Sequence, residues 1–271
     1  MWLIFLTLIL FAVLIKTEKN MPYLKDPPDK MRESYKTNFK LFAFNEITLA
    51  LLSIESLYLL VDRFSGHGLL SDMPDGPFKY LLAFVLMDLT LYLWHRSEHA
   101  FKFLWGFHQV HHSDACLNVS TSVRFHTLSL ILVIIVKTLF FITMGLSAVT
   151  ILFYEGIVAL FVTFQHANIT FPYEQRIAKI VVVPRLHRLH HSRSLSQRDK
   201  NFGVVFSFWD RLFATYQDAR PAEIGLAAVQ HPSCTQLLKM GFVSALDSMA
   251  YFFRTTRRTY SVINEFLHFN N

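Results

Sequence analysis

The chain has 271 residues, of which 52% are hydrophobic and only 17% are charged. This length suits one sizeable domain, and the composition is too apolar for an ordinary water-soluble domain. A protein embedded in a lipid bilayer is therefore expected. The net charge of +6 could indicate nucleic-acid binding, but the basic residues lie mostly beside hydrophobic segments, where a membrane surface explains them better. The membrane is the expected partner, and nucleic acid is not.

The first 40 residues predict a membrane anchor followed by a basic loop. Met1 to Ile15 is almost wholly apolar and could cross or nearly cross a bilayer. Lys16 to Lys40 is polar and holds seven Lys or Arg residues and the Pro27-Pro28 break. Because cytoplasmic segments near membrane helices carry an excess of Lys and Arg, this loop is expected on the cytoplasmic side.

Residues 41–170 are expected to contain the membrane helices. Leu41 to Val61 and Phe78 to Trp94 are each long enough to span a bilayer, and Thr127 to Phe164 suits two shorter helices joined near Gly145. This last segment could cross the membrane or only re-enter it. Together with the anchor, these segments predict an all-α integral-membrane bundle of about four spanning or re-entrant helices. The Lys and Arg bias then places His95 and the later histidine clusters on the cytoplasmic side of a multi-pass protein.

Two charged residues, Lys137 and Glu155, interrupt the apolar stretch Thr127 to Phe164. Each lies nine residues from Leu146, so two antiparallel helices would hold them at similar depth. Charges in hydrocarbon are costly and usually paired, which predicts an ion pair between these two side chains. The alternative is a short, shallow hairpin in which Lys137 reaches water.

Eight of the 13 histidines fall into three clusters with helical spacing. One cluster has the pattern HxxxH, and the other two share the pattern HxxHH. Residues four apart lie on one face of a helix, whereas adjacent residues point about 100° apart. Each HxxHH cluster could therefore supply ligands to two metal ions. The clusters consist of His95 and His99; His108, His111 and His112; and His187, His190 and His191.

The remaining histidines and the cysteines narrow the choice of metal. His166 follows the predicted hairpin and is a further expected ligand, and His126 is a candidate. Cys116 and Cys234 have no CxxC spacing and lie outside the clusters, which argues against a structural zinc site or an iron–sulfur cluster. Neutral imidazole suits iron, and two irons would allow dioxygen chemistry. Three histidines fit no pattern and are expected to have no metal role: His67, His231 and His268.

Taken in order, the clusters and their flanks resemble the fatty acid hydroxylase and sterol desaturase family of integral-membrane oxygenases. The likeness covers roughly residues 80–217, and it is specific because spacing and flanking residues agree together. The matching segments are Asp88-Leu-Thr-Leu-Tyr-Leu-Trp-His95-Arg96, His108 to Ser113, Pro184 to Ser192, Asp199 to Gly203 and Trp209 to Tyr216.

The resemblance implies a membrane anchor capped by a cytoplasmic helical histidine-box domain. It also implies two iron ions, which zinc could replace in purified protein, with dioxygen as co-substrate and electrons from outside the chain. Thr170 stands where some relatives have a further histidine, four residues after the His166 position. Carried over by position, the implied ligands are His95, His99, His108, His111, His112, His187, His190 and His191, completed by His166 and, as a weaker candidate, His126.

Polar residues near the clusters are expected to support them. Asp88 lies seven residues before His95, two helical turns away on the same face. Its carboxylate could accept a hydrogen bond from an imidazole, or it could join a network between packed helices. Asn168 could position a ligand or the substrate. Closing a cap over the site, rather than chemistry, is the expected role of Asn201, Gly203, Trp209 and Asp210.

The sequence is expected to form one membrane-embedded domain over residues 1–220, with the third histidine cluster and the cap in 171–220. Residues 221–271 would form an amphipathic tail that lies on the membrane surface or packs on the cytoplasmic domain. The apolar residues with helical spacing and the arginines after them are Phe242, Leu246, Met249, Phe253, Arg254, Arg257 and Arg258.

These features predict an oxidoreductase that uses dioxygen to hydroxylate or desaturate a lipid, such as a sterol or a fatty acyl chain. His231-Pro232 lacks the glycines of a haem-binding loop, and the sequence has no GxGxxG turn. Electrons are therefore expected from a separate reductase, ferredoxin or cytochrome. The alternatives are a histidine-rich metal transporter, which would place its ligands near mid-membrane, and a zinc-binding membrane protein without oxidative activity.

Overall fold

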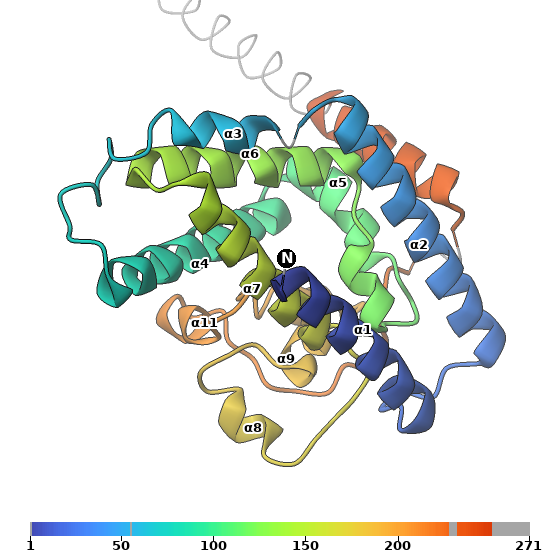
Figure 1. Cartoon of the computed structure of the whole chain (residues 1–271). Helices are drawn as coiled ribbons and strands as arrows, with labels where there is room; N and C mark the ends of the chain where they lie inside the picture. Colours follow the sequence, from blue (N-terminus) through green and yellow to red (C-terminus); the bar gives the residue numbers. More distant parts are fainter. Residues whose placement is uncertain (1, 55, 228–231, 251–271) are drawn as a thin grey trace, which may run out of the picture.

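The computed structural model describes residues 2–54, 56–227 and 232–250, and within them the secondary structure is helical apart from two isolated β-bridges. The predicted all-α fold is confirmed (Figure 1). The helices are α1 (Trp2–Asn20), α2 (Pro28–Leu51), α3 (Ser56–Asp62), α4 (Pro77–Ala100), α5 (Lys102–His112), the 3-10 helix η1 (Val119–Val123), α6 (Thr127–Met144), α7 (Ala148–Gln165), α8 (Glu174–Ile177), α9 (Pro184–His190), α10 (Leu195–Arg198) and α11 (Phe208–Leu212).

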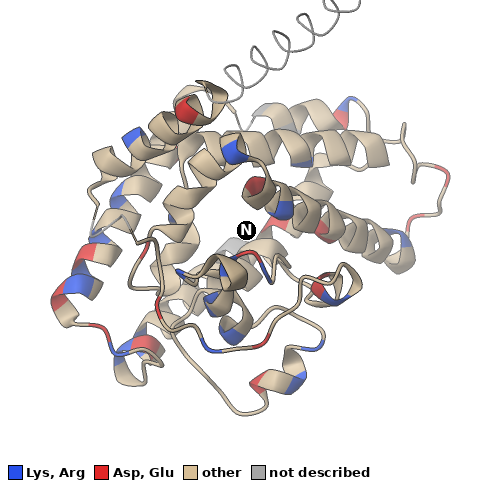
Figure 2. Cartoon of the chain, turned by 180° about the vertical axis from the view of Figure 1, so that it is seen from behind, with Lys and Arg blue, Asp and Glu red and all other residues tan. Residues whose placement is uncertain are grey.

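Three of the described helices, α4, α6 and α7, are long and apolar enough to cross a membrane. Between 22% and 33% of each apolar window is buried inside the protein, so most of its residues are at least partly exposed. Figure 2 shows charged residues along α2 and on the loops and short helices after α7, whereas Lys137 is the only charged residue of α6. Such an apolar surface suits hydrocarbon rather than water.

The predicted single span from Leu41 to Val61 is wrong. Helix α2 begins at Pro28 and ends at Leu51, Ser53 has a positive φ of 52°, and a separate helix α3 follows. The left-handed backbone at Ser53 separates the two helices, and the polar face of α2 packs inside the protein instead of facing lipid. Asn38 donates to the Asp114 carboxylate at 2.9 Å, and Asn45 donates to the Phe125 carbonyl at 2.8 Å.

Helices α6 and α7 form the hairpin predicted around Gly145. Gly145 ends α6 in the left-handed conformation, with φ 73°, which favours glycine. Lys137 Nζ on α6 lies 2.8 Å from Glu155 Oε2 on α7. The predicted ion pair is confirmed, and the two helices are therefore in the antiparallel register that the sequence indicated.

Replacing Gly145 with alanine should destabilise this hairpin. The new Cβ would lie 2.7 Å from the backbone nitrogen of Gly68, in a conformation that alanine rarely adopts. We expect the free energy of unfolding to fall by about 2 kcal/mol or more. Denaturant unfolding in detergent measures this change. Gly76→Ala is the matched control, because its backbone is extended and a Cβ there meets no atom within 4 Å; equal losses would contradict the argument.

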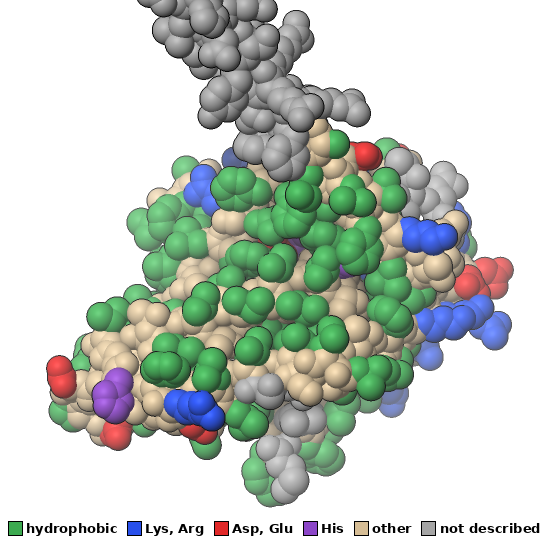
Figure 3. All heavy atoms as spheres, turned by 90° about the horizontal axis from the view of Figure 1, so that it is seen from above, with side chains coloured by type: hydrophobic (Ala, Val, Ile, Leu, Met, Phe, Trp, Pro, Cys, Tyr) green, Lys and Arg blue, Asp and Glu red, His purple; other side chains and the backbone are tan. Residues whose placement is uncertain are grey.

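A helix at residues 234–250 packs one face on the rest of the protein and leaves an apolar face exposed. Leu237 and Ala245 are buried, whereas Phe242, Leu246 and Met249 are between 42% and 62% exposed. The amphipathic pattern is therefore present over the described part of the tail. Figure 3 shows the broad hydrophobic face of the molecule, with small areas of histidine visible between the apolar side chains. The predicted positions Phe253, Arg254, Arg257 and Arg258 lie outside the described residues.

Candidate metal centre

Four helices bring the histidine clusters together. His95 and His99 lie in the last two turns of α4, and the chain turns at Phe101 into α5, which carries the second cluster. Helix α9 carries His187 and His190, and His166 caps the end of α7. All of these side chains therefore lie near one end of the candidate membrane helices, as the positions of the clusters predict.

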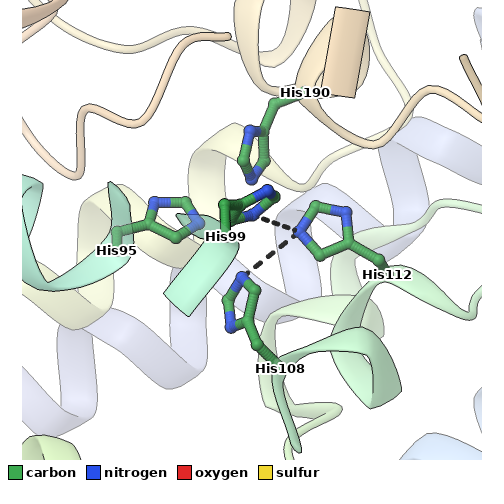
Figure 4. Close-up of side chains that lie close together, drawn as sticks. All are labelled: His95, His99, His108, His112 and His190. Carbon is green, nitrogen blue, oxygen red and sulfur yellow. Dashed lines mark hydrogen bonds between the residues drawn. The ribbon is translucent and has the colours of Figure 1, made fainter. Parts of the chain in front are cut away.

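Nine of the described histidines form two groups, and within each group one ring nitrogen per residue lies within 4.8 Å of all the others. The groups touch each other, because His112 of the first stacks on His191 of the second with ring centroids 4.5 Å apart. The first group contains His95, His99, His108, His112 and His190 (Figure 4), and the second contains His111, His166, His187 and His191.

Helical spacing explains how the clusters divide between the groups. In each cluster, the residues four apart share a group: His108 pairs with His112, and His187 with His191. The histidine in between, three residues after the first, joins the other group. Adjacent histidines thus face two different centres, as expected when neighbouring side chains point about 100° apart.

The ring nitrogens are spaced as ligands of one ion would be. Nε2 of His112 lies 3.2 Å from Nε2 of both His99 and His108. In the second group, His166 Nε2 lies 2.9 Å from that of His187 and 3.1 Å from that of His111. Two nitrogens bound to one ion at about 2.1 Å lie roughly 3 Å apart.

Backbone carbonyls set the tautomer of several rings. His95 Nδ1 lies 2.9 Å from the Phe202 carbonyl, and His190 Nδ1 lies 2.8 Å from the Lys200 carbonyl. Because a carbonyl oxygen only accepts, Nδ1 carries the hydrogen and Nε2 keeps its lone pair for the interior of the group. The same arrangement holds His111 through the Arg124 carbonyl and His166 through the Val162 carbonyl.

Burial favours the neutral form of the two imidazoles on α9. It lowers the pKa of His190 to about 3. Burial also lowers the pKa of His187 well below its usual range, and the neighbouring His166 and His191 add to that effect. Neutral imidazole is the form that binds iron, copper, nickel or zinc. His190 Nε2 is buried and has no hydrogen-bond partner in the protein, which fits a metal ligand. The donor set therefore suits two metal ions.

His126 lies in neither group, although the sequence made it a candidate ligand. Its Nδ1 accepts a hydrogen bond from the Leu128 backbone at the start of α6, and its Nε2 lies 3.2 Å from the Leu238 carbonyl. Both ring nitrogens are thus occupied by a helix cap and a contact to the C-terminal helix. His67 is exposed in the loop between α3 and α4, and His231 and His268 lie outside the described residues.

Asp88 holds the cap and contacts no imidazole. Its carboxylate accepts from the backbone of Val205 at 2.9 Å and Phe206 at 3.0 Å, and from Trp209 Nε1 at 2.9 Å. Asp210 accepts from the backbone of Phe202 at 2.7 Å, next to the carbonyl that orients His95. Of the two expectations for Asp88, the network between packed elements is the one that the structure shows.

The two asparagines also bind backbone. Asn201 donates to the carbonyls of Leu186 at 3.1 Å and Gln217 at 2.7 Å, which ties the cap to α9. Asn168 accepts from the Leu24 backbone at 2.9 Å, so it joins the segment after His166 to the loop after α1. Both act on the position of histidine-bearing elements rather than on a ligand directly.

Asp88→Asn should loosen the cap. An amide offers one acceptor where the carboxylate offers two, and its NH2 group would face N–H donors, so we expect a loss of about 2–3 kcal/mol. Hydrogen exchange of backbone amides in residues 199–216 should accelerate. Asp75→Asn is the control, because its exposed side chain meets only Lys79 and the Tyr80 hydroxyl at the surface, and it should change stability little. Unchanged exchange in the Asp88 variant would contradict this role.

Sequence reasoning missed two acidic contacts to the histidines. His99 Nδ1 lies 3.0 Å from Asp199 Oδ1, and His108 Nδ1 lies 3.3 Å from Glu98 Oε2. Glu98 sits inside the HxxxH pattern, so its position next to His99 was a signal that could have been used. Asp199 is exposed and reaches the site through a loop, for which spacing gives no signal.

A cavity of about 440 Å³ lies beside both groups. It is lined by His95 and His108 from the first group and His111, His166 and His187 from the second. Apolar residues of the α6–α7 hairpin continue the lining down to Lys137 and Glu155. This volume is within the usual range for small-molecule sites, roughly 300–1,000 Å³.

The helices and the site define a membrane-type helical protein with two adjoining polyhistidine centres. A comparison with protein families agrees, since the fatty acid hydroxylase model matches residues 80–215. The chain belongs to the fatty acid hydroxylase family. The matched region contains all nine grouped histidines, Asp88 and most of the cap.

Similar curated proteins are enzymes named for lipid oxidation. The chain is 28% identical over 221 residues to alkylglycerol monooxygenase of Caenorhabditis elegans, covering 81% of this chain and 41% of that protein. It is 31% identical over 155 residues to ornithine lipid hydroxylase OlsE of Rhizobium tropici, covering 55% of this chain and 46% of that protein. The chain thus spans less than half the length of these relatives. No solved structure gave a significant match.

Proposed function

We propose that the protein is a dimetal oxygenase that hydroxylates a C–H bond of a lipid with dioxygen. The observation that carries this proposal is the convergence of nine histidines, eight of them buried, into two adjoining groups beside a cavity lined by membrane-type helices. The names of the curated relatives favour hydroxylation, and desaturation is the variant outcome of the same test.

Iron is the proposed metal, with one ion held by each group. When bound, the irons supply the activation of dioxygen that oxidises an unactivated C–H bond. The balance of a hydroxylation requires two electrons and two protons, because one oxygen atom enters the lipid and the other leaves as water. These electrons are proposed to come from a separate donor protein.

The chain itself contributes positioning and exclusion of water. The segment from Asp199 to Phe202 orients His95, His99 and His190 through two carbonyls and one carboxylate. Asp210 fixes Phe202 at the end of this segment, and Asp88 fixes Val205 just after it. Helices α6 and α7 present apolar side chains to the substrate. Fixed ligands and a dry cavity favour reaction of a held carbon over reaction with solvent.

The membrane location follows the same reasoning. Helices α4, α6 and α7 are proposed to span or enter the bilayer, with the histidine groups at the cytoplasmic surface as the Lys and Arg bias indicates. An apolar substrate could then enter sideways from the membrane leaflet into the cavity.

The test combines metal analysis with lipid analysis. Protein purified without a polyhistidine tag should contain iron at about two per chain and consume dioxygen when given reductant. Lipid extracts of cells with and without the protein should differ by the mass of one oxygen atom on a specific lipid. A loss of two hydrogens would instead indicate desaturation. One zinc per chain without dioxygen uptake would favour a non-oxidative zinc protein, and metal flux into vesicles would favour a transporter.

A further inference from the structure

Five buried polar atoms of residues that line the cavity have no hydrogen-bond partner in the protein, and two of them are the Nδ1 atoms of His108 and His187. The other three are Trp94 Nε1, Ser129 Oγ and Gln165 Oε1. Ser129 is 4% exposed and Gln165 is 3% exposed. Leaving a polar group buried without a hydrogen bond costs free energy, so three such atoms around one cavity indicate a polar ligand there.

These atoms lie at the level of the histidines. Trp94 directly precedes His95, and Gln165 directly precedes His166. Ser129 is eight residues from Lys137 on α6, and Gln165 is ten residues from Glu155 on α7. With a rise of about 1.5 Å per residue, both lie roughly 12–15 Å along the hairpin from the ion pair, on the side of the histidines.

Apolar residues fill the interval between these two polar levels. The lining there consists of Leu130, Val133, Val158, Ala159 and Val162. A ligand that hydrogen-bonds to the unpartnered atoms and fills the apolar part of the cavity therefore needs two parts. It needs a polar group near the histidines and a hydrocarbon chain that runs towards Lys137 and Glu155.

The donors and acceptors specify the polar group. Trp94 Nε1 can only donate a hydrogen bond, Gln165 Oε1 can only accept one, and the Ser129 hydroxyl can do both. A hydroxyl group on the ligand satisfies both requirements, whereas a carboxylate can only accept. Among the described lining residues, the only Lys or Arg is Lys137, whose ammonium lies 2.8 Å from Glu155. The cavity is thus poorly suited to an anionic group.

We propose that Trp94, Ser129 and Gln165 bind an uncharged, hydroxyl-bearing lipid head group beside the two histidine groups. The carbon that is oxidised then belongs to the head group or to the first carbons of the attached chain, rather than to the middle of a hydrocarbon tail. This inference rests on the proposed function and names its substrate class.

The test measures binding of a radiolabelled long-chain alkylglycerol to the full chain in detergent micelles. Unlabelled fatty acid and alkane of the same chain length serve as competitors. We expect the fatty acid and the alkane to compete at least about tenfold more weakly than unlabelled alkylglycerol, because neither completes the hydrogen bonds. Equal competition by the alkane would overturn the proposal.

Two variants separate the head-group contacts from simple apolar binding. Ser129→Ala and Gln165→Met should each weaken alkylglycerol binding about fivefold, as expected for one lost hydrogen bond, and leave competition by the alkane unchanged. Thr138→Val is the matched control, because this α6 hydroxyl already bonds to the Ile134 carbonyl and does not line the cavity. Thermal unfolding should show that Ser129→Ala folds normally, since the lost hydroxyl has no protein partner. Unchanged binding in both variants would refute the site.

The binding assay uses neither dioxygen nor reductant, so its failure is distinguishable from failure of the proposed function. Selective binding without any oxidised product would leave the head-group site standing and refute the oxygenase. Oxidised product without selective binding would refute only the head-group site.

Discussion

Replacing His112 or His191 with alanine should lower lipid oxidation on the order of a thousandfold, because each substitution removes a proposed ligand from one ion. The two positions are matched: both are fully buried, both are the fifth residue of an HxxHH cluster, and the rings stack on each other. Metal analysis after anaerobic loading with iron should find about one ion fewer per chain in each variant.

His126→Ala is the control for these two variants. It removes a buried imidazole close to the site but belongs to neither group. We expect normal iron content and oxidation, with a loss of about 1 kcal/mol in stability because the ring caps α6. Full iron content and activity in both the His112 and His191 variants would contradict the proposed ligand sets.

Lys137→Met should destabilise the protein by about 3 kcal/mol. The Glu155 carboxylate is only 29% exposed, and the substitution removes the ammonium that lies 2.8 Å from it. A membrane environment does not screen such a charge as water does. Unfolding in detergent or in nanodiscs measures the change in free energy.

A second substitution tests whether charge is the cause. In the double variant Lys137→Met with Glu155→Gln, no net charge is buried, so most of the lost stability should return. If the double variant were less stable than Lys137→Met alone, the loss would come from packing rather than from the buried charge.

The spacing of residues within single helices and within one hairpin was enough to predict several contacts in the structure. The i, i+4 spacing of His108 and His112 and the equal distances of Lys137 and Glu155 from Leu146 predicted contacts that the structure contains. Both follow from the geometry of one helix or one hairpin. The turn between the two helices at Gly145 could also be predicted, because glycine readily adopts the left-handed conformation that ends α6 there.

Contacts between residues far apart in the sequence could not be predicted from local periodicity. The stretch from Leu41 to Val61 has the composition of a span, but helix α2 begins earlier and ends at Leu51, and its Asn38 and Asn45 donate hydrogen bonds to Asp114 and Phe125 in a distant loop. Likewise, Asp88 has the spacing to contact His95 along α4, but its carboxylate instead accepts a hydrogen bond from the Val205 backbone. A pattern within one helix does not show which distant hydrogen-bonding group will pack against it.

Because each HxxHH cluster divides its histidines between two groups, the number of residues in α5 and α9 cannot change without displacing some of these side chains. Inserting one residue between His108 and His111 would rotate the following part of α5 by about 100°, so that side chains of one histidine group would turn towards the other group or away from both. Deletions would do the same in the opposite sense. Point substitutions on the outer faces of these helices should be tolerated far better than any change in residue number, and variation in chain length is expected to be confined to the loops.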